Sequence, residues 1–91
     1  MSYELVSDRG FFPYFRRLPQ NVKEKARKNY RLWRQNPNHP SLQFKRVHPT
    51  EPIYSVRVGI GWRAMGLWED NDIYWFWIGS HAEYDKLLKR L

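Results

Sequence analysis

Three side chains that could act together on a phosphate group lie in the second half of the chain. Arg57 and Arg63 stand on either side of the loop Gly59-Ile60-Gly61, and His81 follows the aromatic run Ile73–Ile78. Guanidinium groups match the geometry of phosphate oxygens and stay charged. An imidazole can accept or donate a proton near neutral pH. Two fixed positive charges beside one titratable ring therefore indicate a site that handles phosphate.

The lengths of two loops predict that these residues meet at one end of a sheet. A three-residue hairpin loop places Arg57 directly opposite Arg63. Like charges in that position repel each other, and we interpret the pair as sharing an anion. In the alternative interpretation, both side chains extend into solvent or pair with acids elsewhere. A loop of two or four residues within Glu69–Asp72 then places Arg63 opposite Ile78, three residues before His81, whereas an odd length would shift this pairing.

The residues around His81 predict the start of a helix and indicate a second candidate residue, Tyr84, that could assist the imidazole. Ser80 and Glu83 have the spacing of a capping box, which favours a helix that begins at about His81. We therefore interpret Glu83 as a cap and Asp85 as a favourable charge in the first turn. Tyr84 lies one turn from His81 and could orient it, donate a proton or stack on a base. Tyr84 also belongs to the apolar stripe of this helix, so a purely structural role is the alternative.

Together these groups have the properties needed to cleave an RNA backbone. A base removes the proton of the 2′-hydroxyl, arginines stabilise the charge on the phosphoryl oxygens, and an acid protonates the leaving oxygen. The other two histidines, His39 and His48, lie in proline-rich loops with no pattern around them. No motif indicates a metal site, a phosphate-binding glycine loop or a serine nucleophile. We therefore expect neither a metal nor a cofactor.

The hydrophobic pattern predicts one α+β domain, residues 1–91, in which an N-terminal strand and a helical hairpin pack on an antiparallel sheet with a short C-terminal helix. The run at residues 74–78 has large side chains on both faces, which is typical of a buried central strand. The expected elements, in chain order, are a strand at residues 3–6, helices at 11–18 and 19–35, strands at 42–47, 53–58, 62–68 and 73–78, and a helix from residue 81.

Composition narrows the classes of protein and partner. The chain has 91 residues and no cysteine, which excludes disulfides and thiolate zinc sites. The longest apolar run has six residues, too few to span a bilayer, and the N-terminus lacks a signal-peptide pattern. We therefore expect a cytoplasmic protein with no membrane partner. The net charge of +7 is concentrated in residues 1–46, where eleven Lys or Arg accompany three acids. Such a surface attracts nucleic acid, anionic lipid or an acidic protein, unless it is only a solvated helix face.

Three segments resemble the RelE/ParE superfamily of bacterial toxins. Tyr54–Met65 is similar to the family's strand of the form Y-x-V-R-V, a short turn, and Y-R-A or Y-R-L. Pro40–Lys45 is similar to the segment that follows the family's helical hairpin. Ile78–Asp85 is similar to the closing H-x-x-Y segment of RelE-like and HigB-like members. Ser55 differs from RelE, where a second strand lysine is expected.

The resemblance implies a toxin that cuts mRNA in the ribosomal A site without a metal. It assigns Arg63 to the scissile phosphate and Arg57 to the charge of the transition state. It assigns His81 and Tyr84 to positions where members place acid, base or stacking groups. Basic residues of the second helix and the following strand would meet ribosomal RNA, namely Lys23, Lys28, Arg31, Arg34, Lys45 and Arg46.

The resemblance also implies partners and leaves two other functions open. The partners are the ribosome with its mRNA and a cognate antitoxin, which we expect to wrap the basic face with an acidic segment. ParE-like members keep the fold but inhibit DNA gyrase and cut no RNA, so a gyrase inhibitor is the first alternative. An inactive basic RNA-binding module is the second. The H-x-x-Y ending favours the nuclease branch.

Overall fold

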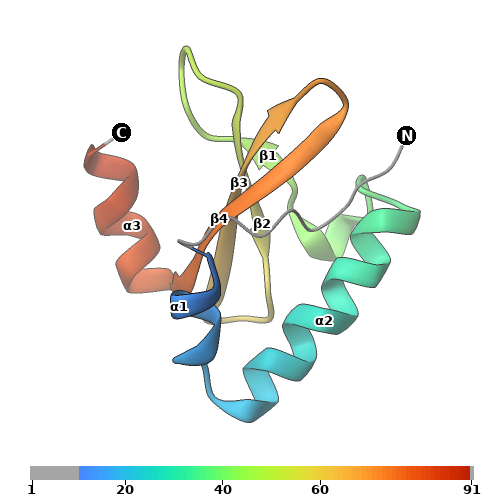
Figure 1. Ribbon diagram of the computed structural model, residues 1–91, viewed down its shortest axis with the longest axis vertical. Helices are drawn as coiled ribbons and strands as arrows, with labels where there is room; N and C mark the ends of the chain where they lie inside the picture. Colours follow the sequence, from blue (N-terminus) through green and yellow to red (C-terminus); the bar gives the residue numbers. More distant parts are fainter. Residues whose placement is uncertain (1–10, 91) are drawn as a thin grey trace.

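A four-stranded antiparallel sheet with helices on both faces forms the protein, as the computed structural model shows for residues 11–90 (Figure 1). The strands lie in the order β1-β2-β3-β4 within this part of the chain. The predicted α+β class is confirmed, while the strand expected at residues 3–6 lies outside the described residues. The elements are α1 (Phe11–Arg16), α2 (Gln20–Gln35), the 3-10 turn η1 (Pro40–Leu42), β1 (Lys45–Arg46), β2 (Ile53–Arg57), β3 (Trp62–Glu69), β4 (Asp72–Ser80) and α3 (His81–Arg90).

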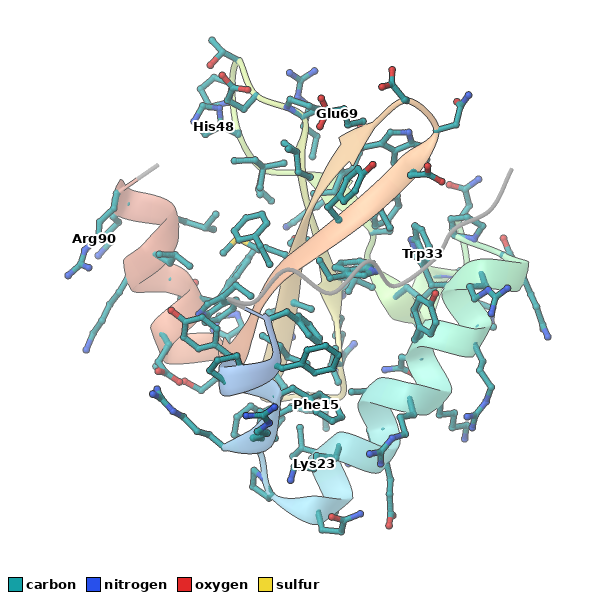
Figure 2. The ribbon with its side chains drawn as sticks, in the orientation of Figure 1. Phe15, Lys23, Trp33, His48, Glu69 and Arg90 are labelled. Carbon is teal, nitrogen blue, oxygen red and sulfur yellow. The ribbon has the colours of Figure 1, made fainter. Side chains whose placement is uncertain are left out.

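The two faces of the sheet bury separate apolar clusters. α2 covers one face, where Trp33 is 1 % exposed and packs edge-on against Trp75 at 5.4 Å between ring centroids (Figure 2). α3 covers the other face, where Met65 and Tyr84 are buried with Trp77. Large rings bury much apolar area per residue, which lets this short chain form two cores. Because α3 is fixed on its own core, the side chains at its start have a defined place relative to the sheet.

A β-bulge in β4 separates the two tryptophans of the aromatic run. Gly66 pairs with Trp75 and Met65 pairs with Trp77, so Phe76 is an extra residue without a partner on β3. Without the bulge, residues two apart would share one face of the sheet. With it, Trp75 joins the α2 side and Trp77 the α3 side. A Cβ at Gly66 would lie 2.8 Å from Ile73 and 2.9 Å from Trp75, which explains the glycine at this position.

The two hairpin loops have the lengths that the sequence predicted. The loop of residues 59–61 closes with a bond from Val58 N to Trp62 O of 2.9 Å, and Arg57 pairs with Arg63 as expected. The next hairpin has a two-residue loop whose residues, Asp70 and Asn71, have φ of 51° and 68°. Two consecutive positive φ angles match the twist of a tight hairpin turn. The residues of each loop therefore determine the register of β2 with β3, and of β3 with β4, next to the turn.

One pairing and one strand position were predicted wrongly. Arg63 faces Gly79 and not Ile78, because the bulge inserts one residue before this point. β4 is buried on both faces as expected, but it is not central in the described sheet, where it follows β3 at the end of the order. α1 packs along it, with the rings of Tyr14 and Trp77 6.2 Å apart.

The strand predicted at residues 42–47 is shorter than expected. Lys45–Arg46 pair with β2, Val47 N donates to Ile53 O at 2.8 Å, and the preceding Pro40–Leu42 form the turn η1. Pro40 suits the first position of such a turn, and the His39 ring accepts a bond from Ser41 N at 3.2 Å. Gln43 then adopts a left-handed conformation with φ of 46°, which interrupts an extended strand.

Candidate functional site

The two arginines of the predicted phosphate site lie side by side on β2 and β3. Arg57 Nε and Arg63 Nη1 both donate to the Gly59 carbonyl, at 3.4 and 3.5 Å, and Arg63 Nη1 also donates to Trp62 O at 2.8 Å. Both side chains are half-buried. Burial lowers the pKa of Arg63 from its ordinary value, and the positive charge of Arg57 lowers this pKa further. The two cations therefore form a site whose repulsion a bound anion would offset.

His81 lies at the same end of the sheet as the arginines. Ser80 pairs with Trp62, and the His81 backbone N–H donates to the Gly61 carbonyl at 2.8 Å. The first residue of α3 is thus bonded to the loop that Arg57 and Arg63 flank, and Figure 1 shows the turn between β2 and β3 near the start of α3. The predicted placement of Arg57, Arg63 and His81 at one end of the sheet is confirmed.

The expected capping box holds the start of α3. Glu83 N donates to Ser80 Oγ at 3.2 Å, while Ser80 N and Ser80 Oγ donate to Glu83 Oε1 at 3.2 and 2.9 Å. Reciprocal bonds of this kind satisfy two backbone donors that the helix leaves free. The reading of Glu83 as a cap is confirmed, and its carboxylate is occupied by Ser80.

The contact between Asp85 and His81 was not predicted from the sequence. His81 Nδ1 lies 3.2 Å from Asp85 Oδ2, with the two side chains 47 % and 54 % exposed. A pair this exposed adds little to stability, so its main effect is on the orientation and tautomer of the ring. The carboxylate also lies close enough to Arg63 to raise that residue's pKa in part. The i,i+4 spacing of His81 and Asp85 was the available signal.

Tyr84 is placed in the α3-side core. Its side chain is 4 % exposed, and its hydroxyl donates to Ser55 Oγ at 2.9 Å. The ring lies 5.9 Å from the His81 ring and 6.4 Å from the Trp77 ring, between centroids. The ring is therefore near His81, while its hydroxyl is bonded inside the protein. Ser55, where a lysine was expected by resemblance, is itself 2 % exposed and accepts this bond.

Replacing Tyr84 with phenylalanine is expected to lower the free energy of unfolding by about 1–3 kcal/mol, because the buried Ser55 hydroxyl loses its partner. Ser55→Ala with Tyr84→Phe should cost less than the sum of the single changes. Urea unfolding measures both, and Tyr14→Phe, at an exposed tyrosine, is the control. If Tyr84 instead supplies a proton in a reaction, the activity of the folded Tyr84→Phe protein will fall beyond any loss of folded protein.

The basic residues of α2 spread across the face of the helix that lies away from the core. At about 100° per residue, Lys23, Arg31 and Arg34 share one flank with Arg27. Arg27 lies over the Phe15 ring at 5.3 Å, so this flank faces the side of α1 (Figure 2). Lys28 lies about 60° from Arg31 around the helix, so the predicted RNA-contacting residues of α2 lie on one broad face.

Lys25 continues this basic face beyond Lys28, about 60° further around the helix. A Cβ at Gly59 would lie 3.3 Å from Lys25 Cδ, so Lys25 lies along the loop beside the arginines. Asn29 Nδ2 also donates to Arg57 O at 3.3 Å on this side. Lys25 was not singled out in the sequence, although its three-residue spacing from Lys28 was visible. Lys25 therefore connects the positive charge of the arginine site with the basic face of α2.

The two basic residues of β1 lie elsewhere on the molecule. Lys45 and Arg46 are exposed on the outer strand. The Arg46 guanidinium donates to the carbonyls of His48 and Thr50, at 3.1 and 2.9 Å, and so fixes the following loop. Figure 2 shows His48 at the end of the sheet opposite the hairpin of Gly59.

Residues 11–90 lack the side-chain clusters and the long apolar helix that other kinds of site would need. No three His, Cys, Asp or Glu side chains in this range come together in a way that could hold a metal ion. No helix in it is long and apolar enough to cross a membrane. An apolar cavity of about 40 Å³ lies between α2 and the sheet, lined by residues that include Ala26, Trp33 and Ile78. The candidate site is thus an open cationic surface and not this cavity.

The fold and the site define a small α+β protein with a basic helical hairpin and a cationic end of its sheet. A family model described as a ParE-like toxin domain matches residues 20–86, and the chain belongs to this family, within the RelE/ParE toxins. The structure is similar to the crystal structure of the isolated E. coli RelE toxin, with a TM-score of 0.65, 20% identity and 98% of each chain covered. No curated protein matches the chain in sequence. Membership of a toxin family implies a cognate antitoxin as a partner.

Proposed function

We propose that this toxin domain, residues 1–91, inhibits translation by cleaving mRNA on the ribosome without a metal ion. The observation that carries the proposal is the arrangement of Arg57, Arg63 and the His81–Asp85 pair around one loop. Two guanidinium groups supply the positive charge that a phosphate needs, and an oriented imidazole supplies proton transfer. The similarity of the fold to that of the RelE toxin supports the same class of reaction.

In the proposed reaction, His81 acts as the general base. The Asp85 carboxylate favours the tautomer with the proton on Nδ1, which leaves Nε2 free to accept a proton. Nε2 takes the proton of the 2′-hydroxyl, and the 2′-oxygen forms a bond to phosphorus. The bond from phosphorus to the 5′-oxygen breaks, and this oxygen takes a proton from water. Arg57 and Arg63 stabilise the added negative charge on the phosphoryl oxygens.

Tyr84 has a supporting role in this proposal. Its ring packs beside His81 and its hydroxyl is bonded to Ser55, so it positions the imidazole from the core. This differs from the acid, base or stacking role that the family resemblance suggested for Tyr84.

The basic face of α2 would contact ribosomal RNA. Lys25 and Lys28 continue from the arginine site, and Arg31, Arg34 and Lys23 extend the basic face towards the side of α1. Phosphate contacts of this kind orient a protein on RNA without reading its sequence. The same positive surface suits an antitoxin with an acidic segment, which would compete with RNA for it. We expect these contacts, with Lys45 and Arg46 on β1, to weaken as salt increases.

A gyrase inhibitor of the ParE type is the second candidate function. The family model that matches the chain is described as ParE-like, and the strand position of Ser55 carries no lysine, which leaves fewer cations at the site. An inhibitor would use the same cationic surface for binding alone and would need no proton transfer by His81.

Expression in a bacterial host with mapping of mRNA 5′ ends tests the proposal. We expect new 5′ ends within translated messages and none in a matched message whose start codon has been removed. A supercoiling assay with purified gyrase is run on the same protein. Inhibited supercoiling with intact mRNA would select the gyrase inhibitor. Absence of growth arrest, with salt-sensitive binding to any RNA, would indicate an inactive RNA-binding module.

A further inference from the structure

The side chain of Ile60 is exposed to solvent in the loop between Arg57 and Arg63. Ile60 is 84 % exposed, whereas the other exposed large apolar residues of the described chain, Phe12 and Tyr14, are 38 % and 37 % exposed. Isolated apolar residues on a surface are common. Ile60 is unusual because it occupies the single position between Gly59 and Gly61, in the loop that Arg57, Arg63 and the His81 backbone contact.

Hydrogen bonds on both sides fix the place of Ile60 relative to the reactive groups. The Gly59 carbonyl accepts from Arg57 and Arg63, and the Gly61 carbonyl accepts from the backbone N–H of His81. Gly59 has φ of 70°, and Lys25 packs along it. Because these bonds hold the backbone on either side of Ile60, the fold sets where this side chain begins relative to the arginines and His81.

We propose that Ile60 is an apolar wedge that packs against a base face of the RNA next to the scissile phosphate. The proposal rests on the proposed nuclease function. When the arginines hold a phosphate, the two adjacent nucleotides lie against the loop that carries Ile60. Attack by the 2′-oxygen in line with the leaving 5′-oxygen requires these nucleotides to be splayed apart. Apolar side chains inserted between bases unstack them in this way, and the base face then covers the exposed isoleucine.

The surroundings of Ile60 favour RNA over a protein as its partner. Apolar anchors of protein interfaces lie within well-packed patches that exclude water. The neighbours of Ile60 along the chain are glycines, and the side chains that contact its loop are Arg57, Arg63 and Lys25. A single apolar group among cations matches a ligand with an anionic backbone and apolar ring faces, which describes single-stranded RNA.

Cleavage of a translated message by purified protein, with Ile60→Ser and Ile60→Leu as variants, tests the wedge. We expect Ile60→Ser to lower the single-turnover rate roughly tenfold or more, because bases must then unstack without help. Ile60→Leu keeps the apolar bulk and should retain most of the rate. Thermal unfolding of both variants should match the wild type, since the side chain is exposed.

A fluorescent base reports the unstacking directly. The message carries 2-aminopurine beside the position that wild-type cleavage identifies, with a 2′-deoxy sugar at the attacking position so that no cut occurs. Wild-type protein and Ile60→Leu should raise the fluorescence on programmed ribosomes, and Ile60→Ser should not. A wild-type rate and fluorescence in Ile60→Ser would overturn the wedge while the nuclease function stands. A wild-type protein that cuts no message would overturn both. An Ile60→Ser protein that cuts normally but escapes its antitoxin would assign Ile60 to the antitoxin surface and overturn the wedge.

Discussion

Replacing Arg63 with alanine is expected to lower the rate of mRNA cleavage about 10²–10³-fold, the loss that follows removal of one donor to a developing negative charge. Arg63 is the more constrained of the two cations. It is half-buried, its guanidinium is bonded to two backbone carbonyls, and burial together with Arg57 lowers its pKa. A fixed charge that needs no rearrangement is effective in the transition state because its position has been set during folding.

The same substitution is expected to leave stability unchanged or slightly higher. Arg63 stands directly opposite Arg57 on the neighbouring strand, and like charges in that position destabilise a sheet by about 0.2–1 kcal/mol. Loss of activity without loss of stability would indicate that Arg63 serves phosphate binding and not folding. Single-turnover cleavage and urea unfolding of Arg63→Ala measure the two quantities. Arg90→Ala removes the same charge at the far end of α3 and serves as the control.

A lysine at position 63 separates charge from geometry. Arg63→Lys keeps the charge but loses the planar fork that can bind two phosphate oxygens. We expect an intermediate rate, with the remaining activity more sensitive to salt. Wild-type cleavage by Arg63→Ala would contradict the assignment of this residue to the phosphate, whatever its effect on stability.

The register of the sheet was predictable where turn chemistry determines it. Glycines at 59 and 61 and the pair Asp70-Asn71 give short loops, so the pairing of Arg57 with Arg63 follows from counting residues. The bulge at Phe76 was not predictable in the same way. It depends on which face of the sheet each neighbouring tryptophan occupies, and this is decided by packing against α2 and α3. The pairing of Arg63 therefore shifted by one residue.

The candidate site shows the same division between local and long-range information. The capping box was recognised from spacing alone, and the His81–Asp85 contact has a spacing that was equally visible. The bond of Tyr84 to Ser55 joins residues 29 apart in the sequence, and no local pattern carries it. In the sequence, Ser55 was noticed only because the family resemblance leads us to expect a lysine at this position. Long-range burial thus decides whether a tyrosine hydroxyl at this position faces a ligand or the core.

Replacing His81 with alanine is expected to lower the cleavage rate about 10²–10⁴-fold, the range that a positioned acid or base contributes. His81 is exposed at the first position of α3, and the capping bonds of α3 come from Ser80 and Glu83. The variant should therefore fold like the wild type. Added imidazole should restore part of the rate, because the space left by the ring is open to solvent. His48→Ala, at the opposite end of the sheet (Figure 2), should keep the wild-type rate.

Asp85→Asn tests how the ring of His81 is held. The amide keeps the size of the side chain but removes the carboxylate 3.2 Å from Nδ1, so the ring loses the acceptor that selects its tautomer and orientation. We expect a smaller loss of rate than in His81→Ala, with binding to the ribosome unchanged. In the His81→Ala background, Asp85→Asn should have little further effect, because its action passes through the ring. Independent losses that multiply in the double variant would mean that Asp85 acts on Arg63 or on the RNA, and the proposed pairing with His81 would be wrong.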